Sequence, residues 1–208
     1  MLNIALPKGR LGDNVYKLLD KLGYDCPEIN KETRRLVFEN KDKGVRYLLV
    51  KPSDVAVYVE KGAADLGVIG SDILKEEGND VFELLDLNMG KCKMCVAAKN
   101  GYEEDMSLPL RVATKYPNTA YRYFNSISRR IEIIKLNGSI ELAPILGLSD
   151  VIVDIVETGS TLRGNDLSVI KDIDNISARL ISNKSAYQFK KEKVDKIVDS
   201  ISEIIVGE

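Results

Sequence analysis

The stretch SDVIVDIVETGSTLRGND, residues 149–166, joins an apolar run to a turn rich in glycine and hydroxyl groups. Its first half, with valine and isoleucine at most positions, is typical of a buried β-strand. The chain then turns at Gly159, and we expect Ser160 or Thr161 to cap a helix. A strand that runs into a helix through such a turn is the repeating unit of α/β folds with mostly parallel strands.

The same alternation of short apolar strands and amphipathic helices continues on both sides of this stretch. We expect strands at residues 3–7, 35–40, 45–50, 64–70, 91–99, 111–114, 131–136, 150–156 and 177–183. We expect helices at residues 10–24, 52–62, 71–78 (capped by Ser71 or Asp72), from about 118, near 139–147 and at 185–205. Two such α/β sets suggest two lobes with a cleft between them, and ligands of such folds bind beyond the carboxyl ends of the strands.

Length and charge exclude several classes of protein. The 208 residues carry a net charge of −2, which argues against a protein that coats nucleic acid. No apolar run approaches the roughly 20 residues of a membrane-spanning helix. The first ten residues, MLNIALPKGR, contain no long apolar segment of the kind found in signal peptides, so we expect a cytoplasmic protein.

The chain contains no histidine and only three cysteines. The missing histidine excludes Ser-His-Asp and Cys-His catalysis and any histidine general base. Cys92 and Cys95 form a CxxC pair, which raises a zinc or redox interpretation. We favour two structural cysteines, because zinc usually needs four ligands and residues three apart in a strand point to opposite faces.

The turn at residues 157–162 has the groups that bind an anion. Backbone N–H groups and the hydroxyls of Thr158, Ser160 and Thr161 are donors, but no lysine follows at the spacing of a nucleotide-binding P-loop. Two carboxylates flank the turn, Asp154 and Glu157; they suit a ligand that also carries ribose hydroxyls or Mg²⁺. A capped turn without any ligand remains the alternative.

Several cations also stand at predicted strand ends. Lys8 and Arg10 lie between the first strand and its helix, where the helix dipole disfavours a positive charge unless an anion is bound. Arg34 precedes a strand, Lys51 stands in a turn before a helix, and Asp65 begins a strand. Each of these positions also suits a solvated side chain.

Taken together, these segments resemble one enzyme family along nearly the whole chain. The stretches that carry the resemblance are LPKGRL, DVAVYVEKGAADLGVIGSDIL, RVATKYPNTA, IIKLNGSIELAPILGLSDVIVDIVETGSTLRGNDL and SARLISN. They are similar, in the same order, to the ATP phosphoribosyltransferases of histidine biosynthesis, and the length resembles the short form of that family.

The resemblance implies both a reaction and a fold. The family joins ATP to phosphoribosyl pyrophosphate (PRPP), requires Mg²⁺, and releases pyrophosphate and N1-(5-phosphoribosyl)-ATP. Adenine N1 attacks with a lone pair, so a chain without histidine can perform this chemistry. The implied fold is that of periplasmic binding proteins: two α/β lobes with a central cleft. We expect residues 1–88 with 180–208 in the first lobe and residues 89–179 in the second.

The resemblance also implies roles for individual residues. For PRPP binding they are Asp154, Glu157, Thr158, Gly159, Ser160, Thr161 and Leu162. For binding of ATP or other substrate groups they are Lys8, Gly9, Arg10 and Asp65. Arg34 matches an arginine that reaches the departing pyrophosphate, and Lys51 stands where many members have arginine, which keeps the charge but loses the bidentate fork. No residue is assigned as a metal ligand, because Mg²⁺ is expected to arrive with the substrate phosphates.

The resemblance finally implies partners. The short form works with a regulatory subunit resembling histidyl-tRNA synthetase, and we expect a homodimer when the chain is alone. After residue 183 one further helix is expected, which leaves no room for a regulatory domain. Two other interpretations are a two-lobed solute-binding protein and a nucleotide-sensing module without catalysis.

Overall fold

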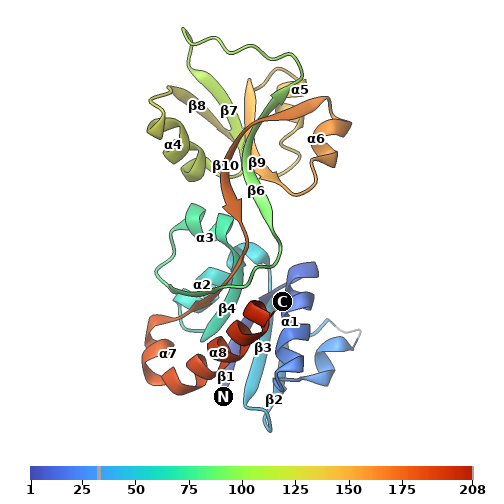
Figure 1. The fold of residues 1–208 in the computed structure, drawn as a ribbon, viewed down its shortest axis with the longest axis vertical. Coiled ribbons are helices and arrows are strands. Elements are labelled where there is room, and N and C mark those ends of the chain that lie inside the picture. Colours follow the sequence, from blue (N-terminus) through green and yellow to red (C-terminus); the bar gives the residue numbers. More distant parts are fainter. Residues whose placement is uncertain (32–33, 208) are drawn as a thin grey trace. The chain divides into compact units, whose positions relative to one another are not determined.

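The computed structural model describes residues 1–31 and 34–207, which form two compact units. Unit 1 comprises residues 1–74, 78–90 and the segment from Ser177 onward, and unit 2 comprises residues 75–77 and 91–176. Figure 1 shows that the first strand (blue) and the last helix (red) both belong to unit 1. Apart from residues 75–77, the chain changes unit at residues 90–91 and 176–177, two and three residues from the expected lobe boundaries. The division into two domains stays a prediction.

Unit 1 is built on a six-stranded mixed sheet. Its strands are β1 (Leu2–Pro7), β2 (Val37–Asn40), β3 (Val45–Val50), β4 (Leu66–Gly70), β5 (Phe82–Asp86) and β11 (Ala178–Ser182). Their order in the sheet is β2-β3-β1-β4-β11-β5. The three central strands β3, β1 and β4 are parallel, and the outer pairings are antiparallel.

Helices cover both faces of this sheet. They are α1 (Arg10–Lys21), η1 (Pro27–Asn30), η2 (Pro52–Asp54), α2 (Val55–Glu60), α3 (Ser71–Glu77), α7 (Lys184–Phe189) and α8 (Lys191–Gly207). Ile4 of β1 lies in one apolar cluster with side chains of α1 and α8, whereas its neighbour Ala5 lies in another with side chains of α2. Successive residues of a strand face opposite ways, so the unit has three layers, with the sheet in the middle.

Unit 2 contains a five-stranded sheet in the order β10-β6-β9-β7-β8. The strands are β6 (Cys92–Lys99), β7 (Leu110–Thr114), β8 (Ile131–Lys135), β9 (Val151–Val156) and β10 (Leu167–Ile176). The helices are α4 (Pro117–Ser126), α5 (Leu142–Ile145) and α6 (Ser160–Gly164). β8, β7 and β9 are parallel, so the loops after them leave the same edge of the sheet. β6 and β10 run antiparallel to their neighbours.

The core of unit 2 again has two sides. Val112 and Val153 pack with α4 on one face of the sheet, and Ala113 and Ile152 pack with α5 and Leu162 of α6 on the other. The helix that follows β9 is therefore anchored to the sheet by a buried leucine.

Most of the predicted elements are confirmed, but two strands were not predicted. The strand stretches at residues 45–50, 131–136 and 150–156 correspond to β3, β8 and β9 within a residue. β5 and β10 were missed, because both are edge strands with many exposed side chains and a weak alternation. β10 also carries two irregularities in its pairing with β6. Both sheets are mixed rather than mostly parallel, because the predicted strands β2, β11 and β6 also pair antiparallel with their neighbours.

Two predicted helix caps are wrong. The residue before α3 is Gly70 and the residue before α6 is Gly159, and neither helix has a side-chain cap. Ser71 is the first residue of α3 itself, and its hydroxyl accepts from the backbone N–H of Ser177 instead. In both cases the glycine takes the position outside the helix, which moves the hydroxyl residues one step inward.

Among the helices that the structure describes, none has the length and apolar character needed to cross a membrane.

Candidate functional site

Three predicted cationic residues lie at one edge of the sheet in unit 1. Pro7 and Val50 are paired at the carboxyl ends of the parallel strands β1 and β3, and the N–H of Lys8 donates to the carbonyl of Val50 at 2.8 Å. Lys8 and Lys51 therefore follow neighbouring strand ends. Arg34 stands three residues before β2, which pairs antiparallel with β3, so it approaches the same edge.

The turn after β1 has a conformation that favours glycine. Gly9 has a φ of 105°, in the region where a side chain would be strained. The next helical turn packs closely on the end of β1, because a Cβ atom at Gly12 would lie 1.9 Å from the carbonyl oxygen of Pro7. These two glycines hold Lys8 at the carboxyl end of β1. Arg10 is the first residue of α1 and is exposed to solvent.

A pocket of about 580 Å³ opens at this edge of unit 1. Lys8, Gly9 and Arg34 line it together with Lys17 and Arg35, and its apolar wall consists of Leu6, Tyr16, Ile29, Leu36 and Leu49. A pocket that combines an apolar wall with several cations suits a ligand with a flat apolar part and phosphate groups. The structure thus brings three of the predicted residues into one pocket, whereas Arg10 and Lys51 lie outside its lining.

Asp65 does not belong to this group. It precedes β4 and accepts a hydrogen bond from the backbone N–H of Asn3 at 2.8 Å, which places it at the amino end of β1. Its buried carboxylate also binds Lys190 Nζ at 2.8 Å through both oxygens. Substrates of such sheets bind at the carboxyl ends of the strands, so we correct the predicted substrate role of Asp65 to a structural ion pair.

The predicted anion-binding turn follows β9 in unit 2. Gly159 has a φ of 69°, a left-handed conformation that glycine adopts without strain. The hydroxyls of Thr158 and Ser160 lie 3.0 Å apart, and the N–H of Ser160 approaches Thr158 Oγ1 at 3.4 Å. Thr158, Ser160 and Thr161 are all exposed. The turn therefore presents several hydroxyl and amide donors to solvent from a short segment of chain.

The last predicted residue of the turn has a different function. The side chain of Leu162 is only 6% exposed and packs against the sheet of unit 2. Only its backbone is available to a ligand, and its side chain anchors the turn to the core. Its predicted place in the PRPP-binding group is therefore restricted to the main chain.

The two predicted carboxylates lie on either side of the end of β9. Asp154 is half-buried in the strand, and its Oδ1 accepts from the N–H of Ile155 at 2.8 Å. Glu157 follows the strand and is exposed. The described residues contain no cluster of three or more potential metal ligands. A Mg²⁺ ion that is bound mainly by substrate phosphates needs only one or two protein carboxylates, so either of these two could contribute to such a site.

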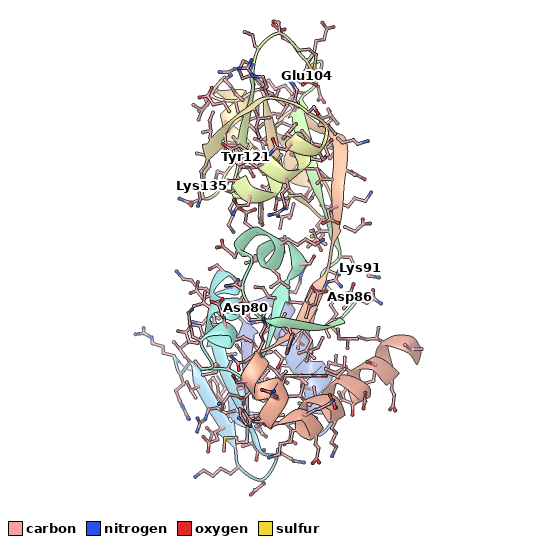
Figure 2. All side chains as sticks on the ribbon, turned by 90° about the vertical axis from the view of Figure 1, so that its left-hand side faces the viewer. Asp80, Asp86, Lys91, Glu104, Tyr121 and Lys135 are labelled. Carbon is pink, nitrogen blue, oxygen red and sulfur yellow. The ribbon has the colours of Figure 1, made fainter. Side chains whose placement is uncertain are left out.

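A second pocket, of about 520 Å³, adjoins the turn in unit 2. Thr158 and Gly159 line it together with Arg163, which the sequence reasoning did not assign. Lys91, which stands directly before β6 and is labelled in Figure 2, lines it as well. The signal for Arg163 was present: it stands four residues after Gly159, a spacing that brings residues together on a helix.

The cysteine pair also borders this pocket. Cys92 is half-buried and Cys95 is buried, and both belong to β6. The thiol of Cys95 donates to Asp172 at 3.4 Å, and burial raises its pKa to about 11. A thiol with so high a pKa is protonated at neutral pH, which makes it a poor nucleophile and a poor metal ligand.

Comparison with known proteins identifies relatives over the full length of the chain. The family model HisG, described as ATP phosphoribosyltransferase, matches residues 51–203. The ATP phosphoribosyltransferase of Brachyspira hyodysenteriae is 64% identical over 206 residues, which cover 99% of this chain and all of that protein. The protein of the same name from Clostridioides difficile is 52% identical over 206 residues and 98% of both chains.

Solved structures give the same result for the fold. The ATP phosphoribosyl transferase (HisG:HisZ) complex from Thermotoga maritima contains a chain that matches with a TM-score of 0.86 and 36% identity over the whole of both chains. The periplasmic aliphatic sulphonate binding protein SsuA from Escherichia coli matches with a TM-score of 0.62 over 98% of this chain and 72% of its own. At 12% identity, this second likeness concerns the fold alone.

The predicted fold class, an α/β fold like that of periplasmic binding proteins, is thereby confirmed. Because the family model covers most of the chain and one relative is 64% identical along 99% of it, the chain belongs to the ATP phosphoribosyltransferase family.

Proposed function

We propose that this chain is the enzyme that transfers the phosphoribosyl group of PRPP to N1 of ATP. The turn in unit 2 and the basic edge of unit 1, which is the sheet edge that carries Lys8, Arg34 and Lys51, hold the two substrates. The products are N1-(5-phosphoribosyl)-ATP and pyrophosphate, and the reaction is the first step of histidine biosynthesis. The observation that carries this proposal is the hydroxyl-rich, left-handed turn after β9 in a chain of this family.

We assign the sugar 5-phosphate to the turn in unit 2. Thr158, Ser160 and Thr161 are exposed and carry hydroxyls, and Gly159 gives the turn its left-handed backbone. Hydroxyl and amide donors bind phosphate oxygens without adding charge. Asp154 lies in the adjoining strand, and we assign it to the ribose hydroxyls, which need an acceptor.

We assign the cations of unit 1 to the substrate phosphates. Lys8 and Arg34 line the pocket at the basic edge, and Lys51 follows the neighbouring strand end. Breaking the bond between ribose C1 and pyrophosphate places negative charge on the leaving group. Cations whose positions in unit 1 are fixed before the reaction are suited to stabilise such charge, because they do not have to reorganise during the reaction. The apolar wall of the same pocket suits the adenine ring of ATP.

Mg²⁺ fits this scheme as a companion of the substrates. It would neutralise phosphate charge, and Asp154 and Glu157 are the carboxylates next to the turn that could complete its coordination. The attacking atom, adenine N1, has a free lone pair, so no side chain needs to remove a proton before attack. The residues of this chain therefore bind, orient and stabilise charge.

We further propose a regulatory partner. The structural relative from Thermotoga maritima is part of a complex of HisG with HisZ. By analogy we propose that this chain assembles with a regulatory subunit resembling histidyl-tRNA synthetase, and that it forms a homodimer in the absence of this subunit.

The test of the proposed reaction is pyrophosphate release from purified protein with ATP, PRPP and Mg²⁺. We expect release only when both substrates are present, together with a product whose mass equals ATP plus a phosphoribosyl group. Omission of each substrate in turn is the control. Binding of both substrates without release of pyrophosphate, alone and with the regulatory subunit, would contradict the proposal and favour a sensing module.

A further inference from the structure

The pocket beside the turn in unit 2 is lined by more cationic side chains than carboxylates. Lys91, Lys93 and Arg163 line it, against the carboxylates of Glu157 and Asp172. Lys93 is already paired with Asp172 through a direct ion pair. Apart from that pair, two cations, Lys91 and Arg163, and one carboxylate, Glu157, line the pocket, and Arg163 is the cation that comes from the same helix as the turn.

The guanidinium of Arg163 lies against the turn. The N–H of Arg163 donates to the carbonyl of Gly159 at 3.1 Å, which fixes the start of the side chain one helical turn away. A Cβ atom at Gly159 would lie only 3.0 Å from Arg163 Nη1 and 4.0 Å from Cζ. The side chain is therefore folded back over Gly159, even though the residue as a whole is exposed.

The charge of Arg163 is available to a ligand. Within residues 1–31 and 34–207 it forms no ion pair. By contrast, a carboxylate partner is present for Arg35, Arg46, Arg111, Arg129 and Arg179. An exposed arginine without a partner usually extends into water because its hydration is favourable. This one lies over a turn whose other donors are uncharged.

A phosphate monoester is a ligand that can use both the neutral donors of this turn and the charge of Arg163. It carries a charge of about −1.5 to −2 at neutral pH, whereas Thr158, Ser160 and Thr161 offer only neutral donors. A guanidinium binds two phosphate oxygens at once through its planar fork. We propose that Arg163 binds the 5-phosphate of the phosphoribosyl donor directly and supplies the positive charge of this subsite. The proposal rests on the proposed function and adds a residue that is specific for the sugar-phosphate end of the substrate.

The test compares Arg163→Gln and Arg163→Lys with the unchanged protein. The probes are ribose 5-phosphate, which carries this phosphate alone, and pyrophosphate, which represents the other end of the donor. Calorimetry gives their dissociation constants, and steady-state kinetics give KM for PRPP and ATP. Arg130→Gln is the matched control, because Arg130 is also exposed, forms no ion pair among the described residues, and directly precedes β8 at the opposite edge of the sheet.

We expect Arg163→Gln to weaken ribose 5-phosphate binding and to raise the KM for PRPP by roughly tenfold, the usual effect of one charge-assisted hydrogen bond. The binding of pyrophosphate, the KM for ATP and kcat should stay within about twofold, because the contact is the same in the ground and transition states. For Arg163→Lys, the KM for PRPP should lie between those of the unchanged protein and Arg163→Gln, since lysine keeps the charge but not the fork. Arg130→Gln should behave like the unchanged protein.

Two outcomes would overturn the inference while leaving the enzyme activity intact. In the first, Arg163→Gln binds ribose 5-phosphate as tightly as the unchanged protein. In the second, Arg163→Gln weakens ribose 5-phosphate binding equally at low and at high salt, which would mean that the side chain acts by packing on Gly159 and not through its charge. Failure of the proposed function looks different, because the unchanged protein would then release no pyrophosphate. Circular dichroism checks that each variant is folded, and the salt dependence of ribose 5-phosphate binding, which should be weaker in Arg163→Gln, provides a second measurement.

Discussion

Thr161 and Leu162 are neighbours in the chain, but they have opposite environments. Thr161 is exposed on the turn after β9, and Leu162 is buried against the sheet. The buried leucine holds the first turn of α6 in place, so that the hydroxyl before it has a defined position at low cost in conformational entropy. Because Leu162 holds this segment in place, removal of the Thr161 hydroxyl should affect phosphate binding without moving the turn.

Replacement of Thr161 by valine should weaken PRPP binding more than ATP binding. Valine keeps the branched shape but removes the donor, and a phosphate oxygen that loses its donor costs roughly 1–3 kcal/mol. Calorimetry with each substrate measures the two losses separately. Ser168→Ala, which removes an exposed hydroxyl from β10, is the control and should change neither. Equal losses for both substrates would refute the assignment of this turn to PRPP.

Arg34 and Arg35 offer a second comparison at the scale of single residues. Both line the pocket of unit 1, but the guanidinium of Arg35 is paired with Glu28 at 2.8 Å, whereas Arg34 forms no ion pair with the described residues. Of these two arginines, Arg34 is the one whose charge no described carboxylate neutralises, so we expect it to act on a leaving group.

We expect Arg34→Ala to lower kcat by at least roughly tenfold and to weaken ATP binding much less, because a charge that acts on departing pyrophosphate matters most in the transition state. Arg35→Ala should have the smaller effect on kcat. Steady-state kinetics with both substrates provide the measurement. If kcat is unchanged and only KM rises in Arg34→Ala, the residue merely binds the ground state.

At the scale of elements, the parallel strands of unit 2 are held in register at their amino ends. Arg111 in β7 and Asp150, directly before β9, form two hydrogen bonds. The backbone N–H of Arg111 donates to the side-chain oxygen Asp150 Oδ2 at 2.8 Å, and the backbone N–H of Asp150 donates to the carbonyl of Arg111 at 2.9 Å. The guanidinium adds an ion pair at 2.6 Å. This side-chain hydrogen bond from Arg111 is the main reason why the pKa of Asp150 is lowered. The pair joins β7 and β9 at their amino ends, and the turn follows β9 at the opposite edge of the sheet.

Replacement of Asp150 by asparagine should therefore reduce the free energy of unfolding by about 1 kcal/mol at pH 7, a modest value because both side chains are partly solvated. A carboxylate with a lowered pKa contributes its full stability above its ordinary pKa of about 3.9, and loses it as the pH falls through the folded-state value. The difference between the two proteins should accordingly shrink below about pH 4.

Urea unfolding followed by circular dichroism at pH 7 and pH 3 measures this difference. Asp199→Asn is the control, because Asp199 is an exposed residue of α8 without an ion pair among the described residues. A stability difference that is equally large at pH 3 would show that the charge of Asp150 does not contribute.

At the scale of the whole molecule, the proposed regulatory subunit leads to a prediction about feedback. If effector binding belongs to the partner, histidine should change pyrophosphate release by this chain alone by less than about twofold. Addition of the subunit should confer inhibition by histidine, because a ligand shifts activity only through a state to which it binds differently. Light scattering after gel filtration reports whether the isolated chain is a dimer and whether the complex forms. Strong inhibition of the isolated chain by low concentrations of histidine would place the effector site in this chain instead.

Local sequence patterns determined much of this protein. The alternation of apolar runs with amphipathic stretches predicted an α/β fold, because hydrophobic periodicity is a property of each segment by itself. The glycine and hydroxyls at residues 158–161 indicated an anion-binding turn for the same reason, since turn conformation and donor chemistry are local. The combination of such stretches in one order also indicated the enzyme family, which the relatives confirm.

The tertiary structure decided what depends on contacts between distant segments. β5 and β10 are strands because of the neighbours with which they pair, and their own sequences show only a weak alternation. Asp65 resembled a substrate ligand until its pairing with Lys190 placed it at the amino end of the sheet. The four-residue spacing brings Arg163 close to Gly159, but only the structure shows that its guanidinium lies over that glycine. The sequence shows which functional side chains the chain contains, whereas strand pairing and packing determine which of them contact one another.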